Sequence, residues 1–161
     1  MRPMATFIGV LLVLLHLTLR VGFGVGTAAP DLMLLGLLVF ARELPLGAAT
    51  GVGLLLGLLE DAMAVLSFGA HAVTLAVLGA VGAATREVFL GDSPWFGFSY
   101  VFLGKITHDA LYWLLSGPDL REPFVRTVLM EGGLAAAYVA AVGVVLFAVT
   151  GLRWDAPGAR R

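Results

Sequence analysis

The chain of 161 residues contains no cysteine, no asparagine and no glutamine. Without cysteine it forms neither a disulfide bond nor a thiolate metal site, so the redox compartment cannot be read from cysteine usage. Without asparagine and glutamine, polar contacts between helices must come from charged side chains, histidine, hydroxyl groups, tryptophan or the backbone. The ten basic and eleven acidic residues nearly balance and are scattered, which gives no footprint for nucleic acid.

Short motifs of common catalytic sites are also missing. The sequence has no GxxxxGK phosphate loop, no HExxH, no GxSxG and no pair of histidines at metal-binding spacing. Ser99 follows Gly97 but precedes Val101, so the nucleophile-elbow pattern fails there. We therefore expect no enzyme activity, no cofactor and no metal, because nothing in the spacing of the three histidines and the acids favours a metal site.

Apolar residues dominate the chain, at 60% against 13% charged, with a mean hydropathy of +0.98. Apolar runs recur until little is left for loops, which predicts an all-α, polytopic membrane bundle of one domain. The six predicted spans are residues 5–19, 29–41, 47–67, 70–84, 95–116 and 127–151. The first is interpreted as a retained helix and not as a secretory signal. The second could be re-entrant, because a full crossing needs roughly 17 residues.

Arginines near the span ends indicate the orientation. With both termini in the cytoplasm, six arginines lie inside and three outside. The inner arginines are Arg2, Arg42, Arg86, Arg153, Arg160 and Arg161, and the outer ones are Arg20, Arg121 and Arg126. The sequence therefore predicts a multi-pass protein of the cell (inner) membrane.

Ionisable residues gather in the outer half of the predicted spans, whereas the inner half is nearly free of them. The residues of this outer layer are His16, Arg20, Asp31, Glu60, Asp61, His71, His108, Asp109 and Glu131. Charged groups inside a membrane are costly and need partners. We expect the layer to tie the helices together, although some of its members could simply be interfacial.

The fifth span carries a polar stripe, because Lys105, His108, Asp109 and Tyr112 follow i, i+3, i+4, i+7 spacing. Lys105 is the only lysine and lies near mid-membrane, where a charge costs about 2.5 kcal/mol or more. Its expected partner is Asp109, with Asp61 as the next candidate. The residues predicted to be critical for the fold or for a partner are Asp31, Glu60, Asp61, Lys105, His108 and Asp109.

Small residues spaced four apart predict close helix packing. Gly47 with Gly51, and Gly53 with Gly57, form two edges on the third span. The glycines predicted to pack against other helices are Gly47, Gly51, Gly53, Gly57, Gly79 and Gly133. A leucine at Gly57 is expected to abolish binding of a partner helix while the protein still inserts.

The order Pro30-Asp31-Leu32, a turn at Pro45, Gly57-Leu58-Leu59-Glu60-Asp61 and then Phe68-Gly69 resembles the MreD family of bacterial rod shape-determining membrane proteins. The resemblance covers about residues 29–84 and continues more loosely at Asp109. Pro30, Gly57, Asp61, Gly69 and Asp109 match family positions. Glu60 and the polar stretch 105–108 depart from the pattern.

The resemblance implies a non-enzymatic scaffold of the cell-elongation machinery, similar in fold to substrate-binding subunits of energy-coupling-factor transporters. The implied partners are an MreC-like single-span protein and, through it, MreB, RodA and a class B penicillin-binding protein. Membrane lipid is a further expected contact, and a homodimer stays open. Alternatives are a transporter subunit with Asp61, His108 and Asp109 lining an outward pocket, or proton coupling through Asp61 or His108.

Overall fold

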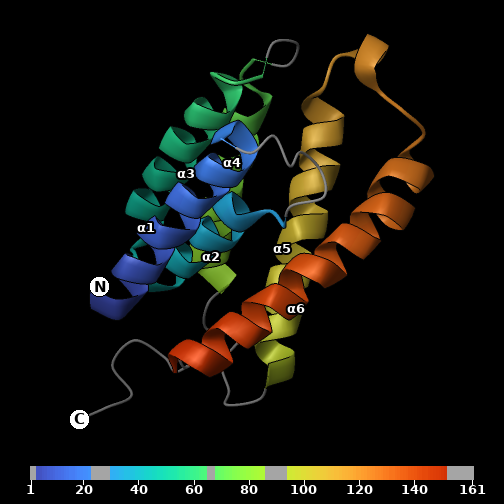
Figure 1. The fold of residues 1–161 in the computed structure, drawn as a ribbon. Helices are drawn as coiled ribbons and strands as arrows, with labels where there is room; N and C mark the ends of the chain where they lie inside the picture. The colour runs from blue at the N-terminus through green and yellow to red at the C-terminus, as the bar shows by residue number, and fades with distance from the viewer. Residues whose placement is uncertain (1–2, 23–29, 65–67, 86–93, 152–161) are drawn as a thin grey trace.

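The computed structural model describes residues 3–22, 30–64, 68–85 and 94–151. Within these ranges the chain forms six α-helices and no strand, which confirms the all-α prediction (Figure 1). The helices are α1 (Pro3–Leu17), α2 (Leu32–Glu43), α3 (Leu46–Asp61), α4 (Ala70–Thr85), α5 (Pro94–Leu115) and α6 (Gly132–Thr150). Three short segments have a different helical pitch: η1 (Thr18–Gly22), η3 (Pro118–Leu120) and η4 (Val125–Glu131).

The helices fall on the predicted apolar runs, with one clear difference in α3. This helix ends at Asp61 and not at residue 67, because the chain turns there, with Ala64 N donating to Asp61 O at 3.1 Å. Residues 65–67 lie outside the described residues. Gly69 then adopts a φ of 94°, a conformation that favours glycine, just before α4 begins.

The start of α2 follows from Asp31, whose side chain accepts a hydrogen bond from Leu34 N at 3.0 Å. This is the usual way in which an aspartate satisfies the free N–H groups of a first helical turn. The helix is only 12 residues long, and every residue from Leu32 to Ala41 is buried. The predicted short second span is therefore a central helix that protein surrounds.

Around α2, the helices α1, α3 and α4 form one close block, and α5 and α6 lie beside it (Figure 1). The most extensive contacts are those of α3 with α4, of α5 with α6 and of α1 with α2. In Figure 1, α6 crosses α5 obliquely and the two diverge toward the end where η3 and η4 lie. This divergence leaves room for a cavity described below.

Three glycines account for the close approach of α3 and α4. A Cβ on Gly53 or Gly57 would lie under 3.0 Å from backbone atoms of α4, and one on Gly79 would lie under 3.0 Å from the backbone of Ala49. By contrast, Gly47, Gly51 and Gly133 have no atom within 4 Å of such a Cβ. These last three glycines therefore pack against no other helix of the described chain, and their packing against a partner helix stays a prediction.

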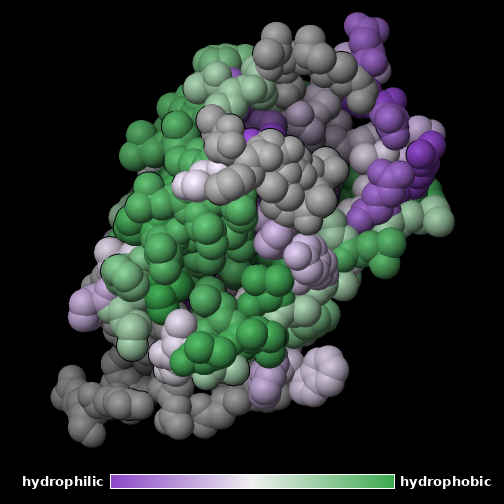
Figure 2. Space-filling model, in the orientation of Figure 1, coloured by the Kyte–Doolittle hydropathy of each residue, from purple (hydrophilic) through white to green (hydrophobic). Residues whose placement is uncertain are grey.

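Two stretches, Pro3–Arg20 and Val125–Thr150, are long and apolar enough to cross a membrane. Helix α5 is long enough but less apolar, and α2, α3 and α4 are shorter. Large apolar side chains stand exposed on several helices, including Phe7, Leu55, Leu134 and Val149, and hydrophobic residues dominate the face of the helical block in Figure 2. An apolar surface of this extent needs lipid or protein to cover it. Of the six predicted inner arginines, only Arg42 lies within the described residues.

Candidate functional site at the polar end of the bundle

Ionisable side chains from five helices meet at one end of the bundle, the upper end in Figure 1. Consecutive helices run in opposite directions, so the ends of α1 and α3 lie near the start of α4 (Figure 1), whereas α2 begins beside the middle of α5, where Lys105 lies. The ionisable residues that the sequence assigns to one outer layer therefore contact one another in the folded chain. Three separate groups of contacts make up this layer.

The first group joins α3 to the end of α1. Glu60 is only 4% exposed, and Arg20 Nη1 donates to its Oε2 atom. His16 Nε2 lies 2.8 Å from Glu60 Oε1, as a close charge contact without hydrogen-bond geometry. Glu60 is therefore part of the packing between α3 and the end of α1.

The second group joins α3 to α4 through Asp61, which is 1% exposed. The carboxylate accepts hydrogen bonds from His71 N at 3.1 Å and from Ala72 N at 2.9 Å, and His71 Nδ1 lies 3.1 Å from Asp61 Oδ1. The first N–H groups of a helix have no partner inside the helix. Asp61 thus caps α4 from the neighbouring helix, and the glycine edge at Gly53 and Gly57 brings the two helices close enough for it to do so.

Replacing Asp61 by alanine is expected to destabilise the α3–α4 pair, because two buried N–H groups would lose their acceptor. Each unsatisfied group costs about 1–3 kcal/mol. Asp61→Asn keeps one carbonyl oxygen and should lose about half as much stability. Thermal unfolding of the purified protein in detergent measures both effects, and equal melting temperatures for wild type and Asp61→Ala would contradict this role.

The third group joins α5 to the start of α2. Lys105 Nζ donates to Asp109 Oδ1 at 2.5 Å and lies 3.4 Å from Asp31 Oδ2. His108 Nδ1 lies 3.0 Å from the same Asp109 oxygen. Asp109 is the expected partner of Lys105, but the second partner is Asp31 and not Asp61. The physical reason is that α2 packs against α5, whereas the Asp61 carboxylate is hydrogen-bonded to the start of α4.

Aromatic contacts connect the second and third groups. The His71 ring lies 4.4 Å from the Tyr112 ring, measured between centroids, and 6.3 Å from the His108 ring. Tyr112 and His108 are stacked with nearly parallel planes. The polar layer is therefore continuous from α4 across α5, although the ion pairs themselves link helices two at a time.

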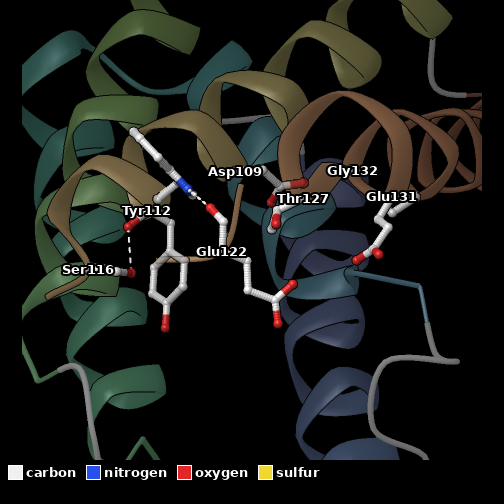
Figure 3. A pocket seen from close by; sticks show the side chains of 9 residues that line it. Asp109, Tyr112, Ser116, Glu122, Thr127, Glu131 and Gly132 are labelled. Atoms are coloured by element: carbon white, nitrogen blue, oxygen red, sulfur yellow. Dashed lines mark hydrogen bonds between the residues drawn. The ribbon is translucent and has the colours of Figure 1, made fainter. Parts of the chain in front are cut away.

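A cavity of about 650 Å³ opens beside this layer, between α5 and the η3–η4 segment that leads into α6 (Figure 3). Its lining residues are Asp109, Tyr112, Trp113, Ser116, Glu122, Thr127, Glu131, Gly132 and Ala135. The outward pocket expected for a transporter subunit was to be lined by Asp61, His108 and Asp109, and only Asp109 lines this one. Glu122 and Thr127 lie in a loop and a π-helical turn, where sequence spacing gives no signal of what they face.

Comparisons with known proteins were made against family models, curated proteins and solved structures. None of them matches this chain. The polar end of the bundle is therefore interpreted from its own geometry. In the part of the chain that the structure describes, no three histidine, aspartate or glutamate side chains are arranged to hold a metal ion. The geometry supplies ion pairs that cross between helices, a capped helix end and an acidic cavity.

Proposed function

We propose that the protein is a non-enzymatic membrane scaffold of the bacterial cell-elongation machinery that binds the transmembrane helix of an MreC-like protein. Its resemblance to the MreD family over about residues 29–84 suggests this function. Two features of the fold support a membrane scaffold: the extensive exposed apolar surface and the burial of every residue from Leu32 to Ala41 in the central helix α2. The indirect partners on this proposal are MreB, RodA and a class B penicillin-binding protein.

The observation that supports the proposal is that buried and partly buried ionisable side chains connect pairs of helices. Arg20 with Glu60, Asp61 with the start of α4, and Lys105 with Asp31 each connect two different helices. Side chains engaged in this way fix the relative positions of helices. A scaffold needs such fixed positions, since it must present a constant surface to another transmembrane helix.

On this proposal all six helices lie within the membrane, with the polar layer toward the extracytoplasmic side and both termini in the cytoplasm. The shorter helices need not be exposed to lipid over a full bilayer thickness, because irregular or short segments are tolerated where protein surrounds them. The burial of α2 on all sides fits this requirement. Its neighbours present apolar side chains to the outside.

The outer edge of α3 is the surface that we assign to the partner helix. Gly47 and Gly51 lie one turn apart on this edge, with no atom within 4 Å of where their Cβ atoms would stand. Small residues at such spacing allow two helix backbones to approach closely in a membrane. Gly57, which the sequence assigns to a partner helix, is left out of this surface because it faces α4.

Gly51→Leu is expected to reduce recovery of the MreC-like partner without lowering the melting temperature of the protein. A leucine side chain would hold the partner backbone away from α3, and a loss of about 1.4 kcal/mol of binding free energy lowers the association constant tenfold. The measurement is co-purification of the coexpressed, tagged proteins from detergent-solubilised membranes. Gly133→Leu is the matched control, since Gly133 is equally open but lies on α6.

Unchanged partner recovery with Gly51→Leu, or an equal loss with Gly133→Leu, would count against the α3 surface. Recovery of an ATPase pair with the wild-type protein, in place of cell-wall factors, would contradict the scaffold itself. That second result would instead favour a substrate-binding subunit of an energy-coupling-factor transporter.

A further inference from the structure

The cavity between α5 and the η3–η4 segment has the dimensions of a ligand site. Its volume of about 650 Å³ falls within the roughly 300–1,000 Å³ that is typical of small-molecule pockets. In Figure 3 the side chains of Tyr112, Glu122 and Glu131 extend toward the same open space, while Asp109 and Thr127 lie close together at its inner end. The cavity is thus a polar hollow with one aromatic wall.

The lining carries negative charge from three separate segments: Asp109 on α5, Glu122 in the following loop and Glu131 in η4. No lysine or arginine is among the described residues that line it. Arg126 pairs with Glu131 through Nε at 3.0 Å, but both side chains are more than half exposed, so water screens this pair. The cavity therefore favours a positively charged occupant.

One carboxylate oxygen of Asp109, Oδ2, is available as a hydrogen-bond acceptor for such an occupant. Its Oδ1 atom is engaged by Lys105 and His108, whereas Oδ2 accepts no hydrogen bond from the described residues. Gly132 leaves the space beside Oδ2 open, since a Cβ there would lie 3.0 Å from this oxygen. The second oxygen of Asp109 thus stands at the wall of the cavity without a donor in the described chain.

Thr127 lies beside Asp109 at the inner end of the cavity (Figure 3). Its Oγ1 atom is buried and has no hydrogen-bond partner in the described part of the chain, although Thr127 lines the cavity. A buried hydroxyl without a partner costs free energy, and in native structures it usually has a ligand or water nearby. The hydroxyl is on the same side of the cavity as Asp109 (Figure 3).

The wall formed by Trp113 already accommodates a guanidinium group. The Arg121 guanidinium lies 5.2 Å from the centre of the Trp113 ring and donates hydrogen bonds to the carbonyl oxygens of Ser116 and Leu114. Trp113 Nε1 in turn donates to Glu122 O at 2.7 Å, which holds the Glu122 backbone beside the cavity. Planar cations and aromatic rings attract one another, and Arg121 already takes this ring face, so the attraction for a cationic occupant comes from the acidic side chains of the lining.

We infer that the cavity binds an organic cation bearing an ammonium or guanidinium group. The acceptors Asp109 Oδ2, Glu122 and Glu131 are too dispersed for one metal ion among the described residues, but they suit donors spread over a small organic molecule. The cation belongs either to a free solute or to an arginine side chain of another polypeptide. This inference does not depend on the scaffold function, since it concerns α5 and η4 and not the outer edge of α3.

Isothermal titration of the full-length protein in detergent tests the inference with agmatine, which carries a guanidinium and an ammonium group. We expect saturable binding of one agmatine per chain, and no binding of butanol or glutarate at the same ionic strength. The double variant Glu122→Gln, Glu131→Gln is expected to weaken agmatine binding about tenfold or more, because two charged acceptors are lost. Asp119→Asn is the matched control, since Asp119 is exposed on η3 and does not line the cavity.

A second titration separates the two sources of the cation. Binding of a blocked Ala-Arg-Ala peptide more tightly than agmatine, with no binding of its citrulline counterpart, assigns the cavity to an arginine side chain. Tighter binding of agmatine assigns it to a free solute. Binding of neither probe, or an equal loss with Asp119→Asn, overturns the inference. If the double variant does not fold, Glu122→Gln alone gives the same test, because Glu122 is exposed.

Discussion

Replacing Gly57 by alanine is expected to destabilise the packing of α3 against α4 strongly. The added Cβ would lie under 3.0 Å from the backbone of His71 and Ala72. Backbone atoms cannot rotate away as a flexible side chain can, so α3 and α4 would have to separate. That separation would also break the hydrogen bonds from Asp61 to His71 N and Ala72 N.

The expected loss is about 3 kcal/mol, the upper part of the usual range for overpacking. Thermal unfolding of the detergent-purified protein measures it. Gly51→Ala is the matched control, because it lies on the same helix with nothing within 4 Å. Alanine there should leave stability unchanged or raise it by up to about 1 kcal/mol, since glycine is the poorer helix former. Similar melting temperatures for the two variants would show that α3 and α4 are not in close contact.

Lys105→Met is expected to produce the second large loss of stability. The methionine has a similar length but no charge, so Asp31 and Asp109 would face one another without the cation that now lies between them. Breaking a buried ion pair by removing one partner costs about 3–5 kcal/mol. The low end applies here, because the side chains of Asp31 and Asp109 are 23% and 18% exposed and His108 still contacts Asp109.

A charge-neutral triple variant gives the control for this prediction. Adding Asp31→Asn and Asp109→Asn to Lys105→Met removes both uncompensated carboxylates, and asparagine at position 31 can still cap α2. We expect the melting temperature to recover most of the loss. A triple variant no more stable than Lys105→Met alone would mean that the stability depends on the shape of these side chains and not on their charges.

The helices themselves were determined by local features of the sequence. Apolar runs long enough for a helix, a proline at the head of α5 and an aspartate that caps α2 act within a few residues, so their effects are visible without a fold. The gathering of ionisable groups at one end was also predictable. Consecutive helices alternate in direction, so polar residues late in one helix and early in the next must lie at the same end.

The tertiary structure alone decided which of these groups meet. Spacing along a helix shows that residues share a face but not which neighbour that face contacts. The choice of Asp31 over Asp61 beside Lys105, and of Gly53 and Gly57 over Gly47 and Gly51 for packing, therefore depended on how α3 and α5 are rotated about their axes. The cavity also depended on how the helices are arranged. It lies where α6 diverges from α5, and the crossing angle of these two helices cannot be read from spacing along either one.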